Sequence, residues 1–206
     1  MKKAFILYNN SGKSDNERSL ITRLHILYML YQLHGHFSAD FDLVLFGTEH
    51  SYDWLDSTGI PDIVRICYST KYDDKTIFLN WLFMLVDDRI GEYDSVISID
   101  GDMKIKDWPL FTEKVTEYTS NPEFLCAGRS YSNKYGFKCI NASFNVFNMR
   151  SLNGRIDSGM IRRLIDDYYG LTDRFSGTNI HMHNYEENVL GRIFFDTLGG
   201  FFNVEE

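Results

Sequence analysis

Apolar runs typical of buried strands alternate with helical segments through the first half of this chain. The strand-like runs cover residues 2–10, 41–48, 62–69 and 95–99. Apolar residues recur at helical spacing over 14–35 and 73–91. Because parallel strands need long and usually helical connections, this order predicts a mostly parallel sheet. Two later runs, 123–128 and 138–149, lie close together in the sequence and predict an antiparallel pair.

The length and composition suit one α/β domain with a mixed, mostly parallel sheet flanked by helices. The chain has 206 residues, of which 44% are hydrophobic and 16% aromatic, so it can bury a sizeable core and is not disordered. Further helices are predicted over 107–122, 157–170 and 186–199. The formal net charge of -8 argues against sequence-independent binding of nucleic acid, which needs a basic surface.

The first predicted helix follows "SDNE" (residues 14–17), a capping-box pattern, and is expected to end near Gly35. Six of its apolar and aromatic residues recur at core spacing. They are Leu20, Ile21, Leu24, Leu27, Tyr28 and Tyr31. We therefore expect this face of the helix to pack on the sheet.

The three cysteines indicate a reducing compartment. Cys67, Cys126 and Cys139 form no CxxC pair, are odd in number and fall in strand-like runs, so buried reduced thiols and a cytoplasmic location are expected. The start, "MKKAFILYNN", is a poor signal peptide, and no apolar run reaches the length of a transmembrane helix. The abrupt end at "GGFFNVEE" leads us to expect that the chain is one module of a longer protein.

The segment "SVISIDGDMKI" (95–105) places two carboxylates immediately after a buried strand. Side chains at i and i+2 of an extended chain point to the same side, so Asp100 and Asp102 repel each other unless a cation lies between them. Mg²⁺ or Mn²⁺ prefers such oxygen ligands. The alternative is a solvated turn, since Asp and Gly are common turn residues. The apolar strand in front favours a metal site at the rim of a sheet.

Three classes of metal site could contain this motif. An EF-hand loop requires an acid or Asn at the position of Lys104, so this class is set aside. A phosphohydrolase of the haloacid-dehalogenase type has a Thr or Val at this position, and its motif usually lies near the start of the chain. Lys104 and the mid-chain position of the motif therefore count against this class. The third class is the nucleotide-sugar transferase, which has DxD in mid-chain after a nucleotide-binding half.

Three stretches together resemble the GT-A fold glycosyltransferases of the retaining type. "SVISIDGDMKI" resembles the strand and DxD motif of that family. "CINASFNVFNM" (139–149) resembles the "FNAGVMLIN" strand of glycogenin-like and bacterial galactosyltransferases, and "YEENVLGRIFF" (185–195) resembles the "DESHLNKYF" segment of α-1,3-galactosyltransferases. The resemblance implies a single Rossmann-like GT-A domain over 1–206, with a nucleotide-binding half (about 1–105) and an acceptor or sugar half (about 106–206).

The resemblance also implies roles for the acids. Asp102 matches the firmer metal ligand, and Asp100 matches the acid that reaches the metal or the donor ribose. Glu187 falls where a carboxylate faces the reacting sugar carbon, and Glu186 falls where a carboxylate holds sugar or acceptor hydroxyls. Both glutamates also fit a plain alternative, because acids are favoured in the first turn of a helix by its dipole.

The resemblance places the nucleoside near the end of the first strand. Tyr8 could stack on the base, and Asn9 and Asn10 could hydrogen-bond to the base or ribose. Lys75 lies near the position of a base-side cation in retaining members. A turn with a tyrosine at the edge of the core is the alternative for the first three residues.

The donor sugar is expected against the strand that follows. Asn141, Ala142 and Ser143 should line its pocket. His181 or His183 could supply a third metal ligand, although a histidine in a polar loop is more often only solvated.

The predicted activity is transfer of a hexose from a UDP-sugar to a hydroxyl acceptor, expected to be a glycan, with Mn²⁺ or Mg²⁺ and with retention of configuration. Two alternatives stay open: a phosphohydrolase using Asp100 as nucleophile, and a sugar-binding module without catalysis. An inverting enzyme would need a general base, for which Asp157, Asp166 or Asp196 are candidates. Trp108 could form a wall of the acceptor site or simply pack.

Overall fold

The computed structural model describes residues 1–9, 17–37, 39–47, 55, 59, 63–67, 81–121, 123–133, 136–175 and 185–204. The strands are β1 (Lys3–Asn9), β2 (Asp42–Gly47), β3 (Ile63–Cys67), β4 (Ser95–Ile99), β5 (Cys126–Ser132), β6 (Lys138–Asn148) and β7 (Phe201–Asn203). The helices are α1 (Glu17–Phe37), α2 (Asp88–Gly91), α3 (Trp108–Ser120), α4 (Met149–Leu152), α5 (Ser158–Phe175), α6 (Tyr185–Gly191) and the π-helix η5 (Arg192–Thr197).

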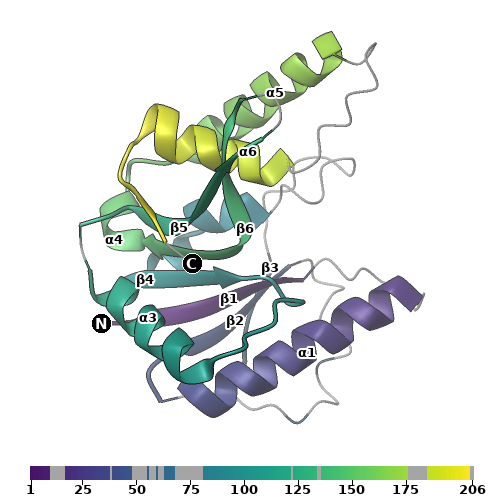
Figure 1. Ribbon diagram of the computed structural model, residues 1–206, viewed down its shortest axis with the longest axis vertical. Coiled ribbons are helices and arrows are strands. Elements are labelled where there is room, and N and C mark those ends of the chain that lie inside the picture. Colours follow the sequence, from purple (N-terminus) through teal and green to yellow (C-terminus); the bar gives the residue numbers. More distant parts are fainter. Residues whose placement is uncertain are drawn as a thin grey trace.

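One seven-stranded sheet forms the centre of the molecule, in the order β3-β2-β1-β4-β6-β5-β7 (Figure 1). The strands β3, β2, β1 and β4 run parallel, as the alternation of strands and helices predicts. The strand β6 runs antiparallel to both β4 and β5, which confirms the expected antiparallel pair. The strand β7, which pairs parallel with β5, was not predicted, because three mostly exposed residues carry no strand-like apolar run.

The helices α1 and α3 cover one face of the sheet. Alternate residues of β1, Phe5 and Leu7, point to this face and join one buried cluster with Leu30 of α1 and Val115 of α3. This period-two alternation is the pattern of a strand that has a core on both sides. Asp107 caps α3 by accepting the N–H of Leu110 at 2.9 Å, as its position before "WP" predicts.

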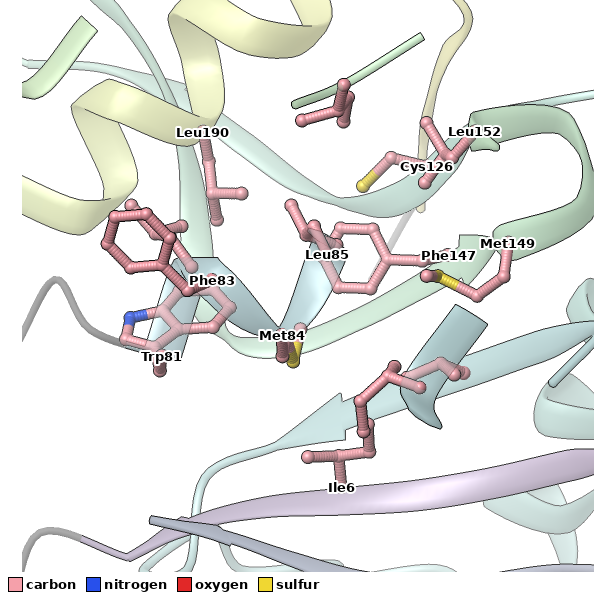
Figure 2. Packing of buried hydrophobic residues seen from close by; sticks show 14 of the residues in the cluster. Ile6, Trp81, Phe83, Met84, Leu85, Cys126, Phe147, Met149, Leu152 and Leu190 are labelled. Atoms are coloured by element: carbon pink, nitrogen blue, oxygen red, sulfur yellow. The ribbon is translucent and has the colours of Figure 1, made fainter. Parts of the chain in front are cut away.

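The other face is covered by residues 81–91, α4, α5, α6 and η5. The remaining β1 residues, Ala4 and Ile6, point into this second cluster, as the close view in Figure 2 shows for Ile6. Trp81 and Phe83 are buried there. Phe147 of β6 packs against Phe194 of η5 with ring centroids 5.9 Å apart.

The predicted helix over 73–91 differs from the structure in its described part. Residues 81–86 form 3₁₀ turns, and only Asp88–Gly91 are α-helical. Asp87 separates the 3₁₀ turns from α2. Its carboxylate accepts the N–H of Arg89 and so caps the start of α2. The apolar side chains of this segment are nearly all buried, so tertiary packing rather than helical periodicity fixes its path.

The buried face predicted for α1 is wrong. Its core side consists of Ile26, Met29, Leu30, Leu33 and Phe37. Five residues that we expected in the core are exposed instead, and the sixth, Leu27, is half-buried. The five are Leu20, Ile21, Leu24, Tyr28 and Tyr31. Since α1 is apolar on two sides, spacing alone cannot tell which side contacts the sheet.

The C-terminal helices agree in place with the sequence prediction. The segment 186–199 divides into α6 and the π-helix η5, and α5 continues five residues beyond the predicted end at 170, to Phe175. Cys126 and Cys139 are buried and free, as expected. Within the parts of the chain that the structure describes, no helix is both long and apolar enough to span a membrane.

The helix α6 approaches β6 so closely that only glycine fits at its last residue. A Cβ atom on Gly191 would lie 2.1 Å from the main-chain oxygen of Lys138, and a strand backbone cannot move aside cheaply. Gly191 has ordinary helical backbone angles, so the requirement comes from the contact alone.

We expect Gly191→Ala to lower the free energy of unfolding by at least about 2 kcal/mol, because it overpacks the contact between α6 and β6. Urea denaturation followed by circular dichroism measures the change. Gly91→Ala is the matched control, since a Cβ on Gly91 meets nothing within 4 Å. Equal stability of the two variants would contradict the close approach of α6.

Candidate functional site

The two aspartates lie in a tight turn at the carboxyl edge of the sheet. All five residues of β4 are buried up to Ile99, and the chain then turns at Asp100. The N–H of Asp100 donates to the main-chain oxygen of Ser143 on β6 at 2.9 Å, and the N–H of Met103 donates to the oxygen of Asp100 at 3.1 Å. Both ends of the turn are therefore fixed by main-chain hydrogen bonds.

The middle of this turn rests on α1. A Cβ atom on Gly101 would lie 2.9 Å from Cγ1 of Ile26 and 3.5 Å from its Cα atom. Met103 and Ile105 then pack against the same buried cluster, while Lys104 stays exposed. Glycine is needed here because the turn and the helix approach closely.

The two acidic side chains of the turn repel each other. Partial burial and the neighbouring charge of Asp102 both raise the pKa of Asp100. The N–H groups of Gly101 and Asp102 and the nearby His25 act in the opposite direction, but do not outweigh them. Sequence reasoning missed His25, because no motif links this α1 residue to a turn so far away in the chain.

The donor set of the turn fits a hard divalent cation. Two close carboxylates supply oxygen ligands, and a cation between them would relieve the repulsion that raises the pKa of Asp100. Within the described ranges, no group of three or more His, Cys, Asp or Glu side chains gathers around one point. Two protein carboxylates, with water and substrate phosphates as the other ligands, are the arrangement typical of Mg²⁺. His181 and His183 lie outside the described residues.

The predicted sugar-side residues lie on β6, next to the turn. Ser143 holds Asp100 through its main-chain oxygen, and its own N–H donates to Oδ1 of Asn141 at 2.8 Å. The main-chain oxygen of Asn141 accepts the side-chain amide of the fully buried Asn145, also at 2.8 Å. Asn141, Ala142 and Ser143 are all half-buried, so this short stretch is ordered and still accessible.

Glu187 is buried at the start of α6 and hydrogen-bonded through both carboxylate oxygens. Its side chain is 7% exposed. The N–H of Ala142 donates to Oε1 at 3.0 Å, and the Tyr131 hydroxyl of β5 donates to Oε2 in a short hydrogen bond. Each carboxylate oxygen has two lone pairs and accepts one of these hydrogen bonds, so the second lone pair can accept from a further partner.

The next residue of α6 strengthens the same attachment. Oδ1 of Asn188 accepts hydrogen bonds from Nδ2 of Asn133 at 3.3 Å and from the Cys139 thiol at 3.4 Å. The first turn of α6 is thus fixed to β6 and to the β5–β6 connection. The side chain of Glu186 lies outside the described residues.

Two neighbouring residues of β6 therefore join the two acidic motifs. Ser143 bonds the turn that carries Asp100, and Ala142 bonds Glu187. Figure 1 shows the three elements involved, β4, β6 and α6, in successive positions. Three stretches that the sequence singled out separately thus meet at the carboxyl end of β4.

The end of β1 completes this edge. Leu7 pairs with Ile99, so Tyr8 lies beside the start of the DGD turn in the neighbouring strand. Tyr8 is half-buried, and its ring lies 6.4 Å from that of Phe46. The backbone of Asn9 belongs to β1, but its side chain, Asn10 and Lys75 fall outside the description.

Four other predicted residues lie in packing, capping or surface surroundings. The ring of Trp108 lies parallel to that of His36, with 4.2 Å between their centroids. Asp157 accepts the N–H of Met160 at 2.7 Å, at the start of α5. Asp166 lines a surface cleft of about 320 Å³ between α5 and η5. Asp196 is exposed on η5.

Comparison with known proteins gives structural matches alone. Neither a protein-family profile nor a curated protein sequence matches the chain. The glycosyltransferase GlyE of Streptococcus pneumoniae superimposes with a TM-score of 0.59 and 13% identity, over 99% of this chain and 46% of GlyE. Mouse xyloside xylosyltransferase 1 superimposes with a TM-score of 0.60 and 11% identity, over 100% of this chain and 86% of that protein.

A nucleotidyl-transferring enzyme shares the fold as well. A cytidylyltransferase of Leptospira borgpetersenii matches with a TM-score of 0.56 and 14% identity, over 100% of this chain and 76% of the enzyme. The chain spans about half the length of GlyE. These matches show that the chain has the GT-A-like α/β fold that these glycosyltransferases and this cytidylyltransferase share.

Proposed function

We propose that this chain is a metal-dependent glycosyltransferase that moves a hexose from a UDP-sugar to a hydroxyl acceptor with retention of configuration. The observation that carries the proposal is the junction on β6, where adjacent residues hold the DGD turn and the buried Glu187. The proposed transfer uses a cation held near the diphosphate and a carboxylate near the sugar, and the junction supports it by bringing Asp100 and Glu187 to adjacent residues of β6.

The proposed roles of the residues follow from their positions at this edge of the sheet. Asp102 and Asp100 would hold Mn²⁺ or Mg²⁺, which stabilises the negative charge that builds on the departing diphosphate. Tyr8, with Asn9, Asn10 and Lys75, would bind the nucleoside at the end of β1. The backbone and side chains of 141–143 would line the sugar, directly between the nucleotide and Glu187.

In the transfer, the bond between the anomeric carbon and the diphosphate oxygen breaks, and its electron pair leaves with UDP. The acceptor oxygen forms the new bond on the same face, and its proton passes to the departing diphosphate. Glu187 would stabilise the positive charge on the sugar carbon or attack it, and Glu186 would orient hydroxyl groups. Tyr131 and Ala142 hold the Glu187 carboxylate in place for either role.

Removal of the metal, or of its firmer ligand, should weaken nucleotide binding. We expect Asp102→Asn to raise the dissociation constant for UDP in the presence of Mn²⁺ at least about tenfold, because Asp102 would hold the ion that offsets the charge of the diphosphate. Isothermal titration calorimetry with Mn²⁺ and with a chelator measures this difference.

Glu113→Gln is the control for that experiment, since it removes one exposed acid from α3 without touching the site. UDP binding that is equally tight with and without metal would contradict the proposal. Release of pyrophosphate from CTP in place of UDP from a UDP-sugar would instead indicate nucleotidyl transfer.

Loss of the hydroxyl that holds Glu187 should slow the chemical step. We expect Tyr131→Phe to lower kcat for UDP release from the preferred UDP-sugar by about tenfold and to leave UDP affinity unchanged, because the Tyr131 hydroxyl holds Glu187 on the proposed sugar side and not the proposed nucleoside site at the end of β1. A screen of UDP-sugars identifies the donor, and NMR of the product identifies the anomer.

Tyr93→Phe is the matched control, because Tyr93 also donates to a carboxylate, that of Asp42, at 2.9 Å. This second pair lies at the amino ends of β2 and β4, opposite the candidate site. Equal effects of the two substitutions on kcat would show that Tyr131 acts only on stability. An inverted product would remove the retaining role assigned to Glu187.

A further inference from the structure

The outer side of α1 exposes an unusual concentration of large apolar side chains. Leu24 is 63% exposed and Tyr28 is 59% exposed, and Leu20, Ile21 and Tyr31 each expose nearly half of their surface. These five account for half of the ten large apolar residues that are exposed in the described part of the chain. Single exposed apolar residues are ordinary, but a contiguous patch marks an interaction surface.

The patch has the spacing of a helix-packing seam. Ile21, Leu24, Tyr28 and Tyr31 follow one another at intervals of three, four and three residues, which places them in one line along the helix. The opposite side of α1 packs on the sheet through Ile26, Leu30 and Leu33. A helix that is apolar on both sides needs cover on both sides.

We propose that this seam, defined as Ile21, Leu24, Tyr28 and Tyr31, packs against the seam of a second copy of this chain. The two α1 helices would run antiparallel about a two-fold axis near residue 26. Ile21 of one copy then lies opposite Tyr31 of the other, and Leu24 lies opposite Tyr28. Each aromatic ring therefore faces a smaller aliphatic side chain, which a parallel pairing would not achieve.

The charges along the helix favour a self-complementary contact. Glu17 and Arg18 precede the seam, and from residue 19 to residue 37 the only Asp, Glu, Lys or Arg is Arg23, so no acid–base pattern along the seam selects an oppositely charged partner. Arg23 is turned toward the body of the protein, with its Nε atom buried. His25 lies on the flank of α1, near Asp100 rather than on the seam. Two uncharged seams can approach without repulsion.

The exposed area agrees with a modest dimer. The five side chains leave on the order of 500 Å² open, at the upper end of patches on monomeric proteins. A standard interface buries about 800 Å² on each partner, so the seam with its flanks suits a small, reversible interface rather than an obligate one. In Figure 1, α1 forms one margin of the molecule, with no described helix or strand over its outer side.

Sedimentation of the full chain over about 1–200 μM tests the proposal. We expect a reversible monomer–dimer equilibrium, and we expect Leu24→Glu to raise its dissociation constant by at least about tenfold by placing a charge in the seam. Leu110→Glu, at a residue of α3 with 50% exposure, is the matched control and should leave the equilibrium unchanged. A wild-type monomer at all concentrations would overturn the proposal, as would a dimer that both variants retain.

Disulfide trapping checks the orientation without relying on the charged variant. A mixture of Leu24→Cys and Tyr28→Cys proteins should form a cross-linked heterodimer under mild oxidation, while each variant alone should cross-link several-fold less. The wild type, treated in the same way, accounts for any contribution of its own cysteines. Equal cross-linking of each variant with itself would refute the antiparallel pairing.

Discussion

The antiparallel pairing of β4 with β6 is the constraint on which the candidate site depends. A parallel neighbour would bring its own carboxyl end beside the end of β4, and both chains would leave the sheet there. Because β6 runs the other way and extends past Ile99, its residues 141–143 stand opposite the DGD turn. The hydrogen bond from Asp100 to Ser143 and the bond from Ala142 to Glu187 both follow from that register. Two motifs far apart in sequence thus become neighbours through one reversal of strand direction.

The same edge concentrates negative charge that a bound cation would offset. Desolvation and the charge of Asp102 raise the pKa of Asp100, so the turn disfavours two negative charges side by side. Nothing in the packing of β4 requires acids at this place, since the strand is already complete at Ile99. Close like charges are a feature of binding sites, because the bound ion or substrate supplies the opposite charge.

How much of this could be predicted from sequence depends on how local each signal is. The strand β4 and its acidic end form one continuous stretch of sequence, so both were predicted. The buried side of α1 was predicted wrongly, because Leu24 and Leu30 belong to two equally regular apolar lines on one helix. The contacts of Glu187 with Tyr131 and of Asp100 with His25 join residues in different elements, and no spacing along the chain encodes them.

The helix α1 connects the candidate site with the proposed dimer. Its inner side supports the DGD turn at Ile26, where the contact with Gly101 is too close for any larger residue to fit without a shift. Its outer side carries the seam, whose centre lies at the same level of the helix. A partner helix packed there would restrain the motion of α1 away from the sheet, and so also the motion of the turn. Precise placement of carboxylates is what a metal and a diphosphate demand, because a shift of about 1 Å in a catalytic group can cost a hundredfold in rate. Association through α1 would therefore be coupled by packing to the order of the DGD turn, with no contact between the partner copy and the turn.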